Sequence, residues 1–398
     1  MAVARSAAER RPIVVWNITR TCNLRCVHCY TNSEAKRYPD ELTNEQCKAV
    51  LADLAGFKVP AVLLSGGEPL IRPDLFELAD FDRGRGLHVV LSTNGTLIDQ
   101  QVAQRLEALR FAYVGISLDS AIPAVHDEFR GVKGAFDRSM RGFRHCVSAG
   151  QKVGLRLTLT RQTLKDLDRI FGFIEDERID RACFYHHLCP AGRGSSLMAP
   201  TPQQSRDAID TIFRRTRRAV EAGRRLEILT VDNPCDGPYL YLSMLKQGHP
   251  RARQVLDMLA WNGGSRWSSG VGIANIDFFG NVHADQFSMY RSFGNVKRRP
   301  FSQVWQDTSD PTMAGLKDRL PLLTGRCASC RFKPVCGGGL RARAEMMTGV
   351  PWASDPGCYL TDAEIQGPPI PIDGNTSGAG SPKDDTASEP KPREGVAT

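Results

Sequence analysis

Three cysteines lie close together near the start of the chain, in the stretch TCNLRCVHCY. Cys22, Cys26 and Cys29 directly follow an apolar run, IVVWNIT, which predicts a β-strand. A 4Fe-4S cluster presents more irons than three cysteines can bind, so one iron would stay open to a substrate or cofactor. The alternative is a zinc site completed by His28, although structural zinc sites favour paired Cys-x2-Cys elements.

A second group of cysteines lies near the other end of the chain. Cys327, Cys330 and Cys336 form a Cys-x2-Cys-x5-Cys array in CASCRFKPVC, and Cys358 follows in DPGCYL. Four thiolates from a compact region suit either zinc or a second 4Fe-4S cluster, and the spacing alone does not separate the two. Five further cysteines have no partner at ligand spacing and are expected to be buried thiols: Cys47, Cys146, Cys183, Cys189 and Cys235.

The motif SGGEP closes the next predicted strand. Gly66 and Gly67 let the backbone approach a ligand, Glu68 supplies an acceptor for an ammonium group, and Pro69 stiffens the exit from the strand. A plain strand-to-helix turn is the alternative for such a motif.

Small polar residues close the strands that follow. STNGT and GISLDS end two successive strands, and a basic residue lies within the next strand, KVGLRLTLT. Each of these would be ordinary turn chemistry by itself. Ligands of barrel proteins gather at the C-terminal ends of strands, so the candidate ligand-binding residues here are Ser92, Asn94, Ser117, Asp119 and Arg156.

Strand and helix patterns alternate from residue 13 to about residue 190, which predicts βα units and a parallel sheet. Thr43 and Gln46 form a capping box that begins a helix, and residues 202–222 are predicted to form another helix. Strands are expected near residues 13–18, 61–65, 88–92, 113–118, 153–160 and 181–187.

Composition divides the chain into five segments, two of which are expected to be a larger and a smaller folded unit. The expected order is an N-terminal extension, a core of βα units, a connecting region, a smaller cysteine-bearing unit and a tail rich in Gly, Pro, Ser and charge. The tail is too poor in apolar residues to fold alone and is expected to be disordered. The expected limits are 1–12, 13–225, 226–270, 271–366 and 367–398.

The overall composition restricts the class of protein. The 398 residues are 41% hydrophobic, enough for a large core, and no apolar run approaches the length of a membrane span. The expectation is a soluble cytoplasmic protein without membrane contact, in which twelve cysteines favour metal binding over disulfides. The net charge of +8 suits an anionic partner, and because the basic residues are scattered, a small polycarboxylate fits better than nucleic acid. The densest arginine run, residues 214–225, is expected to be a solvated helix face.

The Cys-x3-Cys-x2-Cys motif after the first strand resembles the signature of the radical SAM superfamily. That resemblance implies an α/β fold, a partial (β/α)6 TIM-like barrel, in which a 4Fe-4S cluster on the three N-terminal cysteines binds S-adenosyl-L-methionine through its open iron. SGGEP resembles the site for the methionine amino group, and the polar strand ends resemble the sites for the ribose and the carboxylate. Members usually have an aromatic residue before the third cysteine, where this chain has His28, and Tyr30 follows that cysteine.

The second cysteine group resembles the SPASM/Twitch extension of many radical SAM enzymes, which holds auxiliary clusters. Full SPASM domains have further cysteines upstream, whereas FFGNVHADQF offers Gln286 and no cysteine. The resemblance therefore implies one auxiliary 4Fe-4S cluster on Cys327, Cys330, Cys336 and Cys358, and two clusters in the whole chain.

Longer stretches, including VVWNITRTCNLRCVHCY, LLSGGEPLIRPDLFELA and RACFYHHLCPAGRG, resemble the NirJ family of haem d1 biosynthesis. This implies an oxidoreductase or lyase that removes propionate side chains from 12,18-didecarboxysirohaem, an anionic tetrapyrrole, with electrons from a donor such as flavodoxin or ferredoxin. The alternatives are removal of acetate groups from the same substrate, a peptide-maturing SPASM enzyme, and a zinc or iron–sulfur scaffold that is not an enzyme.

Overall fold

The computed structural model describes residues 10–186, 189–194, 198–261, 267–368 and 370. Residues 1–9 of the expected N-terminal extension and the expected disordered tail from residue 371 onward lie outside this part. Its strands are β1 (Ile13–Thr19), β2 (Val62–Gly66), β3 (Val89–Thr93), β4 (Tyr113–Ser117), β5 (Val153–Leu159), β6 (Arg181–His186), β7 (Glu227–Val231), β8 (Ile273–Ile276), β9 (Asn281–His283) and β10 (Gly294–Asn295).

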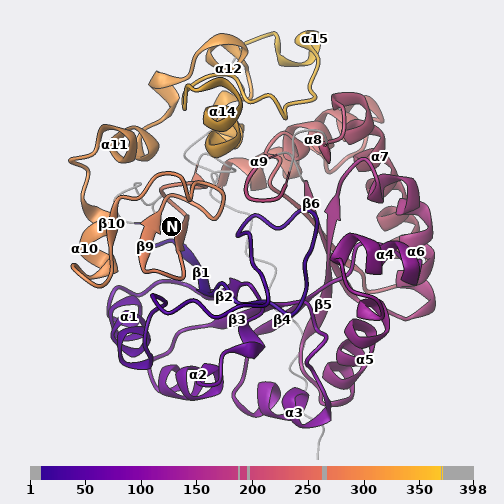
Figure 1. The fold of residues 1–398 in the computed structure, drawn as a ribbon. Helices are drawn as coiled ribbons and strands as arrows, with labels where there is room; N and C mark the ends of the chain where they lie inside the picture. The colour runs from indigo at the N-terminus through magenta and orange to yellow at the C-terminus, as the bar shows by residue number, and fades with distance from the viewer. Residues whose placement is uncertain (1–9, 187–188, 195–197, 262–266, 369, 371–398) are drawn as a thin grey trace, which may run out of the picture.

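The helices fall into two groups (Figure 1). Those that follow the first strands are α1 (Asn44–Gly56), α2 (Leu75–Arg83), α3 (Gln100–Ala108), α4 (Pro123–Arg130), α5 (Ala135–Ser148), α6 (Leu167–Asp176), α7 (Pro202–Glu221), α8 (Asp236–Lys246) and α9 (Ala252–Trp261), with the short 3-10 turns η1 (Pro69–Ile71) and η2 (Thr163–Asp166). The later ones are α10 (Phe301–Gln306), α11 (Pro311–Lys317), α12 (Gly325–Ser329), α13 (Lys333–Cys336), α14 (Arg341–Thr348) and α15 (Asp362–Ile365), with η5 (Leu320–Leu322).

All the strands belong to one sheet, in the order β10-β9-β8-β1-β2-β3-β4-β5-β6-β7. Strands β1 to β7 pair in parallel, as the alternation of strand and helix patterns predicted. The six predicted strands are all present, with limits close to those expected. The sheet therefore has the parallel α/β architecture inferred from the sequence.

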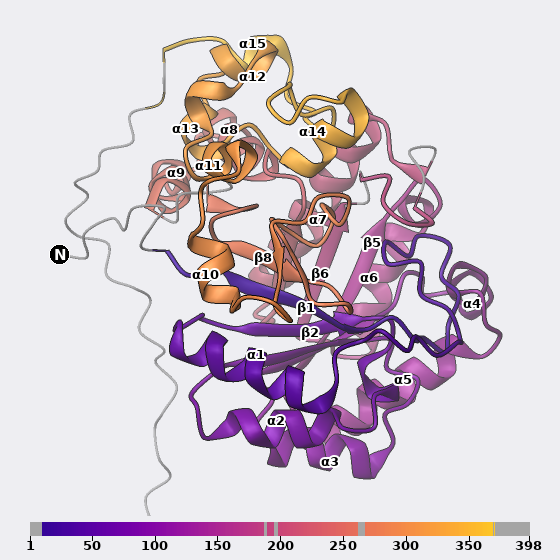
Figure 2. The same cartoon turned by 60° about the vertical axis from the view of Figure 1, so that its left-hand side comes forward.

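Two parts of the sheet were not predicted. Strand β7 lies in the stretch expected to be a connecting region, and it pairs in parallel with β6. Strand β8 pairs in parallel with β1, and β9 and β10 continue as antiparallel partners. Figure 2 shows β8 beside β1, with α12 to α15 gathered above this side of the sheet. The sheet thus runs across the expected limits at residues 225 and 271, and those domain limits stay predictions.

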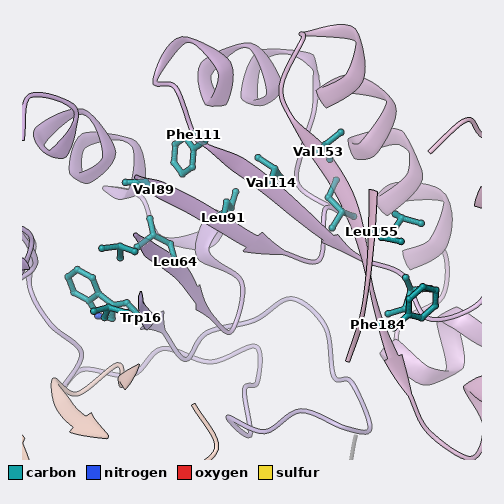
Figure 3. Packing of buried hydrophobic residues seen from close by; sticks show 14 of the residues in the cluster. Trp16, Leu64, Val89, Leu91, Phe111, Val114, Val153, Leu155 and Phe184 are labelled. Carbon is teal, nitrogen blue, oxygen red and sulfur yellow. The ribbon is translucent and has the colours of Figure 1, made fainter. Parts of the chain in front are cut away.

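The core lies between the sheet and the helices that cover it. Figure 3 shows apolar side chains of neighbouring strands on one side of the sheet, facing the helices. Trp16, Leu91, Val114, Leu155 and Phe184 are fully buried there. Parallel sheets that are covered by helices have such apolar strands because the apolar faces lose contact with water.

A local signal explains where α1 begins. The predicted capping box is present, because Thr43 accepts from the backbone of Gln46 and the Gln46 side chain accepts from the backbone of Thr43. Helix α1 then buries Cys47, Val50, Leu51 and Leu54. Helix α7 occupies the second predicted helical stretch, and its arginines form exposed ion pairs, as expected for a solvated face.

None of the helices in the described ranges is both long enough and apolar enough to cross a bilayer.

Candidate active site

A cavity of about 350 Å³ lies at the C-terminal ends of the strands. Its size falls within the range of small-molecule sites, about 300–1,000 Å³. The structure brings together in its wall most of the residues proposed from the sequence: Cys22, Cys26, His28, Cys29, Tyr30, Gly66, Gly67, Ser92, Asn94, Ser117 and Arg156. Glu68, Pro69 and Asp119 are not part of the wall, but Glu68 contacts Asn94 and Asp119 contacts Arg130, and both of these partners are.

The loop with the first three cysteines is held by Arg193, which sequence reasoning missed. Its Nε donates to the carbonyl of Cys26 at 2.9 Å, and its Nη1 donates to the carbonyl of Ser33 at 2.9 Å. The preceding residue, Gly192, has a φ of +59°, and a Cβ there would lie 2.3 Å from the carbonyl oxygen of Cys29. The segment after β6 is therefore packed tightly against the cysteine loop, and it fixes the backbone on both sides of Cys29.

A buried ion pair lies behind the second cysteine. Nη1 of Arg130 is 3.6 Å from the sulfur of Cys26, while its Nε donates to Asp119 Oδ2 at 2.7 Å. The other oxygen of Asp119 accepts from the backbone of Thr158 at 3.0 Å. Burial raises the pKa of the Cys26 thiol, and the neighbouring Arg130 cation opposes that shift. Asp119 therefore positions Arg130 in this structure, and Arg130 itself lines the cavity.

His28 and Tyr30 face the cavity from the cysteine loop. The His28 ring stacks on Phe129, with centroids 4.5 Å apart, and its Nε2 is 3.4 Å from Thr158 Oγ1. The Tyr30 hydroxyl donates to Asn17 Oδ1 at 2.8 Å, and burial raises the pKa of Tyr30 to about 12. Both rings are thus fixed in place and able to contact an apolar or aromatic part of a ligand.

The two glycines of SGGEP set the distance between β2 and the cysteine loop. A Cβ at Gly66, where φ is +121°, would lie 2.3 Å from the carbonyl oxygen of Thr19. A Cβ at Gly67 would lie 2.1 Å from the carbonyl oxygen of Thr21. The sequence suggested that these glycines make room for a ligand. Their tightest neighbour is the backbone that leads from β1 into the cysteines.

Glu68 is fully buried beneath the cavity. One carboxylate oxygen accepts from the backbone of Asn94 at 2.8 Å, and the other accepts from Thr93 Oγ1 at 2.8 Å and from the backbone of Leu70 at 3.1 Å. Burial raises the pKa of Glu68 to about 7 despite these donors. The carboxylate therefore ties the end of β2 to the end of β3. Pro69 is the first residue of η1. The ammonium contact expected of Glu68 stays a prediction.

The remaining strand ends complete the wall. Asn94 donates from Nδ2 to Asn23 Oδ1 in the cysteine loop at 2.8 Å. Ser117 and Arg156 are opposite each other in the register of β4 and β5, and the Arg156 guanidinium lies 4.6 Å from the centroid of the Tyr185 ring. These side chains offer hydroxyl, amide and cationic groups on one side of the cavity.

The second group of cysteines is also brought together. Cys327, Cys330, Cys336 and Cys358 line a small separate cavity. Cys327 lies in α12, Cys330 follows that helix, and Cys336 ends α13. The glycines after Cys336 all have positive φ, which turns the chain sharply around this cavity.

Cys235 lies in the same small cavity, which its position in the sequence did not predict. All five thiols without ligand spacing are buried, as expected. The Cys235 thiol donates to Asn233 Oδ1 at 3.5 Å, and its closeness to Cys358 lowers the pKa of Cys358. Cys235 is far upstream of the other four, so no spacing rule could have grouped it with them.

Cys189, another of these five thiols, lines the larger cavity.

Both groups were expected from the sequence to bind a metal. Within the described ranges, no three His, Cys, Asp or Glu side chains converge closely enough to hold one metal ion. A zinc ion needs four ligands at about 2.0–2.3 Å, whereas the thiolates of a 4Fe-4S cluster each bind a different iron. Burial raises the pKa of Cys22 to about 12 and that of Cys336 well above its ordinary value. Metal binding would release these protons.

Comparison with known proteins agrees with this geometry. The Radical SAM superfamily profile matches residues 16–174. The Fe-coproporphyrin III synthase of Methanosarcina barkeri is 50% identical over 362 residues, which cover 90% of each chain. The pre-heme d1 synthase of Dinoroseobacter shibae is 44% identical over 361 residues, which cover 89% of this chain and 87% of that one.

A solved structure has the same fold. Streptococcus suis SuiB bound to S-adenosylmethionine superimposes with a TM-score of 0.67 at 18% identity, covering 86% of this chain and 76% of SuiB. Together with the cavity at the strand ends and the three cysteines in its wall, these similarities place the protein among enzymes. The chain belongs to the radical SAM superfamily.

Proposed function

We propose that this protein is a radical SAM enzyme that removes carboxylate-bearing side chains from an anionic iron tetrapyrrole of the haem pathway. The observation that carries the proposal is the similarity, along about nine-tenths of the chain, to two enzymes named for tetrapyrrole products. The net charge of +8 suits a substrate with several carboxylates.

Membership of the superfamily implies a 4Fe-4S cluster and S-adenosylmethionine. Cys22, Cys26 and Cys29 are the residues we assign to this cluster, because they share one wall of the larger cavity. The bound cluster and cofactor supply a 5′-deoxyadenosyl radical. The protein then has to hold the cofactor and exclude water from the cavity, and the buried wall of strand ends is suited to that task.

Polar strand ends are proposed to orient the cofactor. Ser92, Asn94 and Ser117 offer hydroxyl and amide groups to the ribose and the methionine carboxylate, and Arg156 offers a cation. We assign the adenine contact to His28 and Tyr30, because both rings are fixed in place beside the cysteines. Glu68 acts on the methionine amino group directly or through Asn94, whose backbone it holds.

The C-terminal thiols are proposed to bind one auxiliary 4Fe-4S cluster. Cys327, Cys330, Cys336 and Cys358 are gathered around one small cavity, and Cys235 adds a fifth sulfur beside Cys358. A donor such as flavodoxin or ferredoxin would supply electrons to the enzyme.

Two candidate products differ in the side chain that is lost. The sequence favoured removal of propionate groups from 12,18-didecarboxysirohaem, and the similarity to the pre-heme d1 synthase supports that reaction. The higher identity to the Fe-coproporphyrin III synthase supports the alternative, removal of acetate groups from the same substrate. Both reactions need the same cavity, cofactor and clusters.

The test is an anaerobic reaction of the reconstituted enzyme with 12,18-didecarboxysirohaem, S-adenosylmethionine and a reductant. Mass spectrometry separates the two products, because a propionate group has one methylene more than an acetate group. We expect loss of side-chain mass together with formation of 5′-deoxyadenosine. If 5′-deoxyadenosine forms while the tetrapyrrole stays intact, the assignment to a tetrapyrrole is wrong and a peptide substrate becomes the leading alternative.

A further inference from the structure

Asp232 has an uncommon backbone conformation at the wall of the larger cavity. It directly follows β7, and its φ is +67°, in the left-handed region that residues other than glycine rarely adopt. Such a conformation is unfavourable for a residue with a Cβ, although aspartate tolerates it better than most residues. It persists only where the surrounding structure holds it, and such positions are often functional.

The C-terminal unit holds this turn. Nη1 of Arg343 donates to the carbonyl oxygen of Asp232 at 3.0 Å, and its Nη2 donates to Asn233 Oδ1 at 3.2 Å. The same guanidinium forms a buried pair with Asp355, at 2.5 and 2.6 Å. Asn233 in turn donates to the carbonyl of Gly357 at 3.1 Å. The conformation of Asp232 is therefore imposed by residues beside the auxiliary cysteines.

The imposed turn places the Asp232 carboxyl group in the cavity wall. Its Oδ2 is buried, and the described residues provide it with no hydrogen-bond partner. Leaving a buried polar atom without a partner is unfavourable, so a ligand group is expected to meet it. Burial raises the pKa of Asp232 to about 7, while Arg343 opposes the shift, so this carboxyl group can hold a proton near neutral pH.

Asp232 lies at a strand end that none of the residues assigned to S-adenosylmethionine occupies, although its carboxyl group interacts electrostatically with Arg156. The residues assigned to S-adenosylmethionine lie in the cysteine loop and at the ends of β2 to β5, whereas Asp232 follows β7, beyond β6 at the far end of that row. Iron occupies the pyrrole nitrogens of an iron tetrapyrrole, so the polar groups left on its rim are carboxyl groups. Two carboxyl groups form a hydrogen bond when one proton lies between them.

We propose that Asp232 is a substrate-binding residue whose carboxyl group shares a hydrogen bond with a carboxyl group of the tetrapyrrole inside this cavity. This inference rests on the proposed function and deepens it, because it names the contact that selects a carboxylate-bearing substrate. Arg343 is the positioning residue that keeps Asp232 turned into the cavity.

The test compares two variants with wild type. Asp232→Gly removes the carboxyl group and relieves the left-handed conformation, so its stability should not fall while its affinity for the substrate does. Asp232→Asn keeps a hydrogen-bond donor at the same place. Arg110→Gly is the matched control, because Arg110 also has a left-handed φ of +58° but is exposed and outside the cavity wall.

Affinity is measured anaerobically on cluster-loaded protein, by absorbance titration with 12,18-didecarboxysirohaem and by a separate titration with S-adenosylmethionine. Thermal unfolding supplies the stability readout. We expect Asp232→Gly to bind the tetrapyrrole about tenfold more weakly, with unchanged affinity for the cofactor. Asp232→Asn should stay within about threefold of wild type, and Arg110→Gly should bind as wild type does.

Two results would overturn the inference. One is wild-type affinity of Asp232→Gly for the tetrapyrrole, and the other is an equal loss of affinity for S-adenosylmethionine, which would move Asp232 to the cofactor site. A wild-type protein that does not bind 12,18-didecarboxysirohaem is a different result. It would show that the proposed function is wrong, and the contact inferred for Asp232 would be wrong with it.

Discussion

Nη1 of Arg130 lies 3.6 Å from the sulfur of Cys26, while Nε of the same guanidinium is held by Asp119 at 2.7 Å. A fixed cation beside a cluster ligand stabilises the additional negative charge of the reduced cluster. Nothing in the spacing of the cysteines marks Arg130 for this place, since it lies at the end of α4.

Replacement of this cation should change the redox behaviour of the N-terminal cluster. We expect Arg130→Gln to lower its reduction potential by about 59 mV, which is a tenfold destabilisation of the reduced form in a one-electron couple. Redox titration followed by electron paramagnetic resonance measures the potential. Arg144→Gln is the control, because Arg144 pairs with Glu177 on the surface. An unchanged potential would show that Arg130 has no electrostatic effect on the cluster.

The two cysteine groups should load iron independently. Simultaneous replacement of Cys22, Cys26 and Cys29 by alanine should abolish cleavage of S-adenosylmethionine while leaving iron and sulfide bound at the C-terminal site. The reason is that the two groups line separate cavities. Iron and sulfide counts and the yield of 5′-deoxyadenosine are the measurements. A triple variant with the wild-type yield would contradict the assignment of the cluster.

Glu68→Gln should weaken cofactor binding more than cluster assembly. An amide has one acceptor atom where the carboxylate has two, so either the Asn94 backbone or the Thr93 and Leu70 donors would face an NH2 group. Loss of the proposed charged hydrogen bond from the methionine ammonium group to Glu68 would be worth about 1.5–3 kcal/mol, or about one to two decades in affinity for S-adenosylmethionine.

Calorimetric titration measures that affinity, and iron content checks the cluster. Glu77→Gln is the control, because Glu77 pairs with Lys48 on an exposed face of α2 and is not in the cavity wall. Equal affinity of Glu68→Gln and wild type would place the methionine amino group elsewhere.

Buried His126 should make the fold sensitive to acid. Its Nδ1 accepts from the backbone of Asp119 at 3.2 Å, and burial lowers the pKa of His126 to about 4. A depressed histidine pKa gives stability that is present above the unfolded value of about 6.5 and is lost as the pH falls towards about 4. We expect the free energy of unfolding to lose about 2 kcal/mol between pH 7.5 and pH 5 from this group.

The matched variant is His126→Asn, whose side-chain oxygen can accept from the same backbone N–H but does not titrate. Denaturant unfolding of both proteins at the two pH values gives the difference. If wild type and variant lose the same stability between pH 7.5 and pH 5, His126 is not the group responsible.

The main features of the fold could be predicted because they depend on local patterns. Strands β1 to β6 are apolar runs bounded by turn residues, and α1 begins at a capping box that is visible in the sequence. No residue of β7 is fully buried, and β8 has only four residues and pairs with β1, which is distant in the sequence. Asn275 in β8, for example, donates to the carbonyl of Val15 in β1 at 2.8 Å, across 260 residues.

The residues of the site also separate into those that the sequence could predict and those that it could not. Its cysteines and SGGEP could be predicted, because each motif is a short contiguous segment with an unusual composition. Arg130, Arg193, Asp232 and Cys235 could not, because each reaches the site from an element far away in the sequence, and single arginine, aspartate or cysteine residues carry no spacing signal. The sequence suggested that Gly66 and Gly67 make room for a ligand. It did not reveal their close contact with the backbone at the end of β1, which only the tertiary structure shows.

The pairing of β1 on both of its edges has a consequence for synthesis of the chain. One edge pairs with β2, which follows soon after, but the other pairs with β8 at residues 273–276. Until those residues leave the ribosome, β1 presents an unpaired apolar edge, and such edges template aggregation. We therefore expect the nascent N-terminal part, with its cysteine loop, to be prone to aggregation until β8 arrives. Cluster insertion before that moment would load a sheet that is still open on one side.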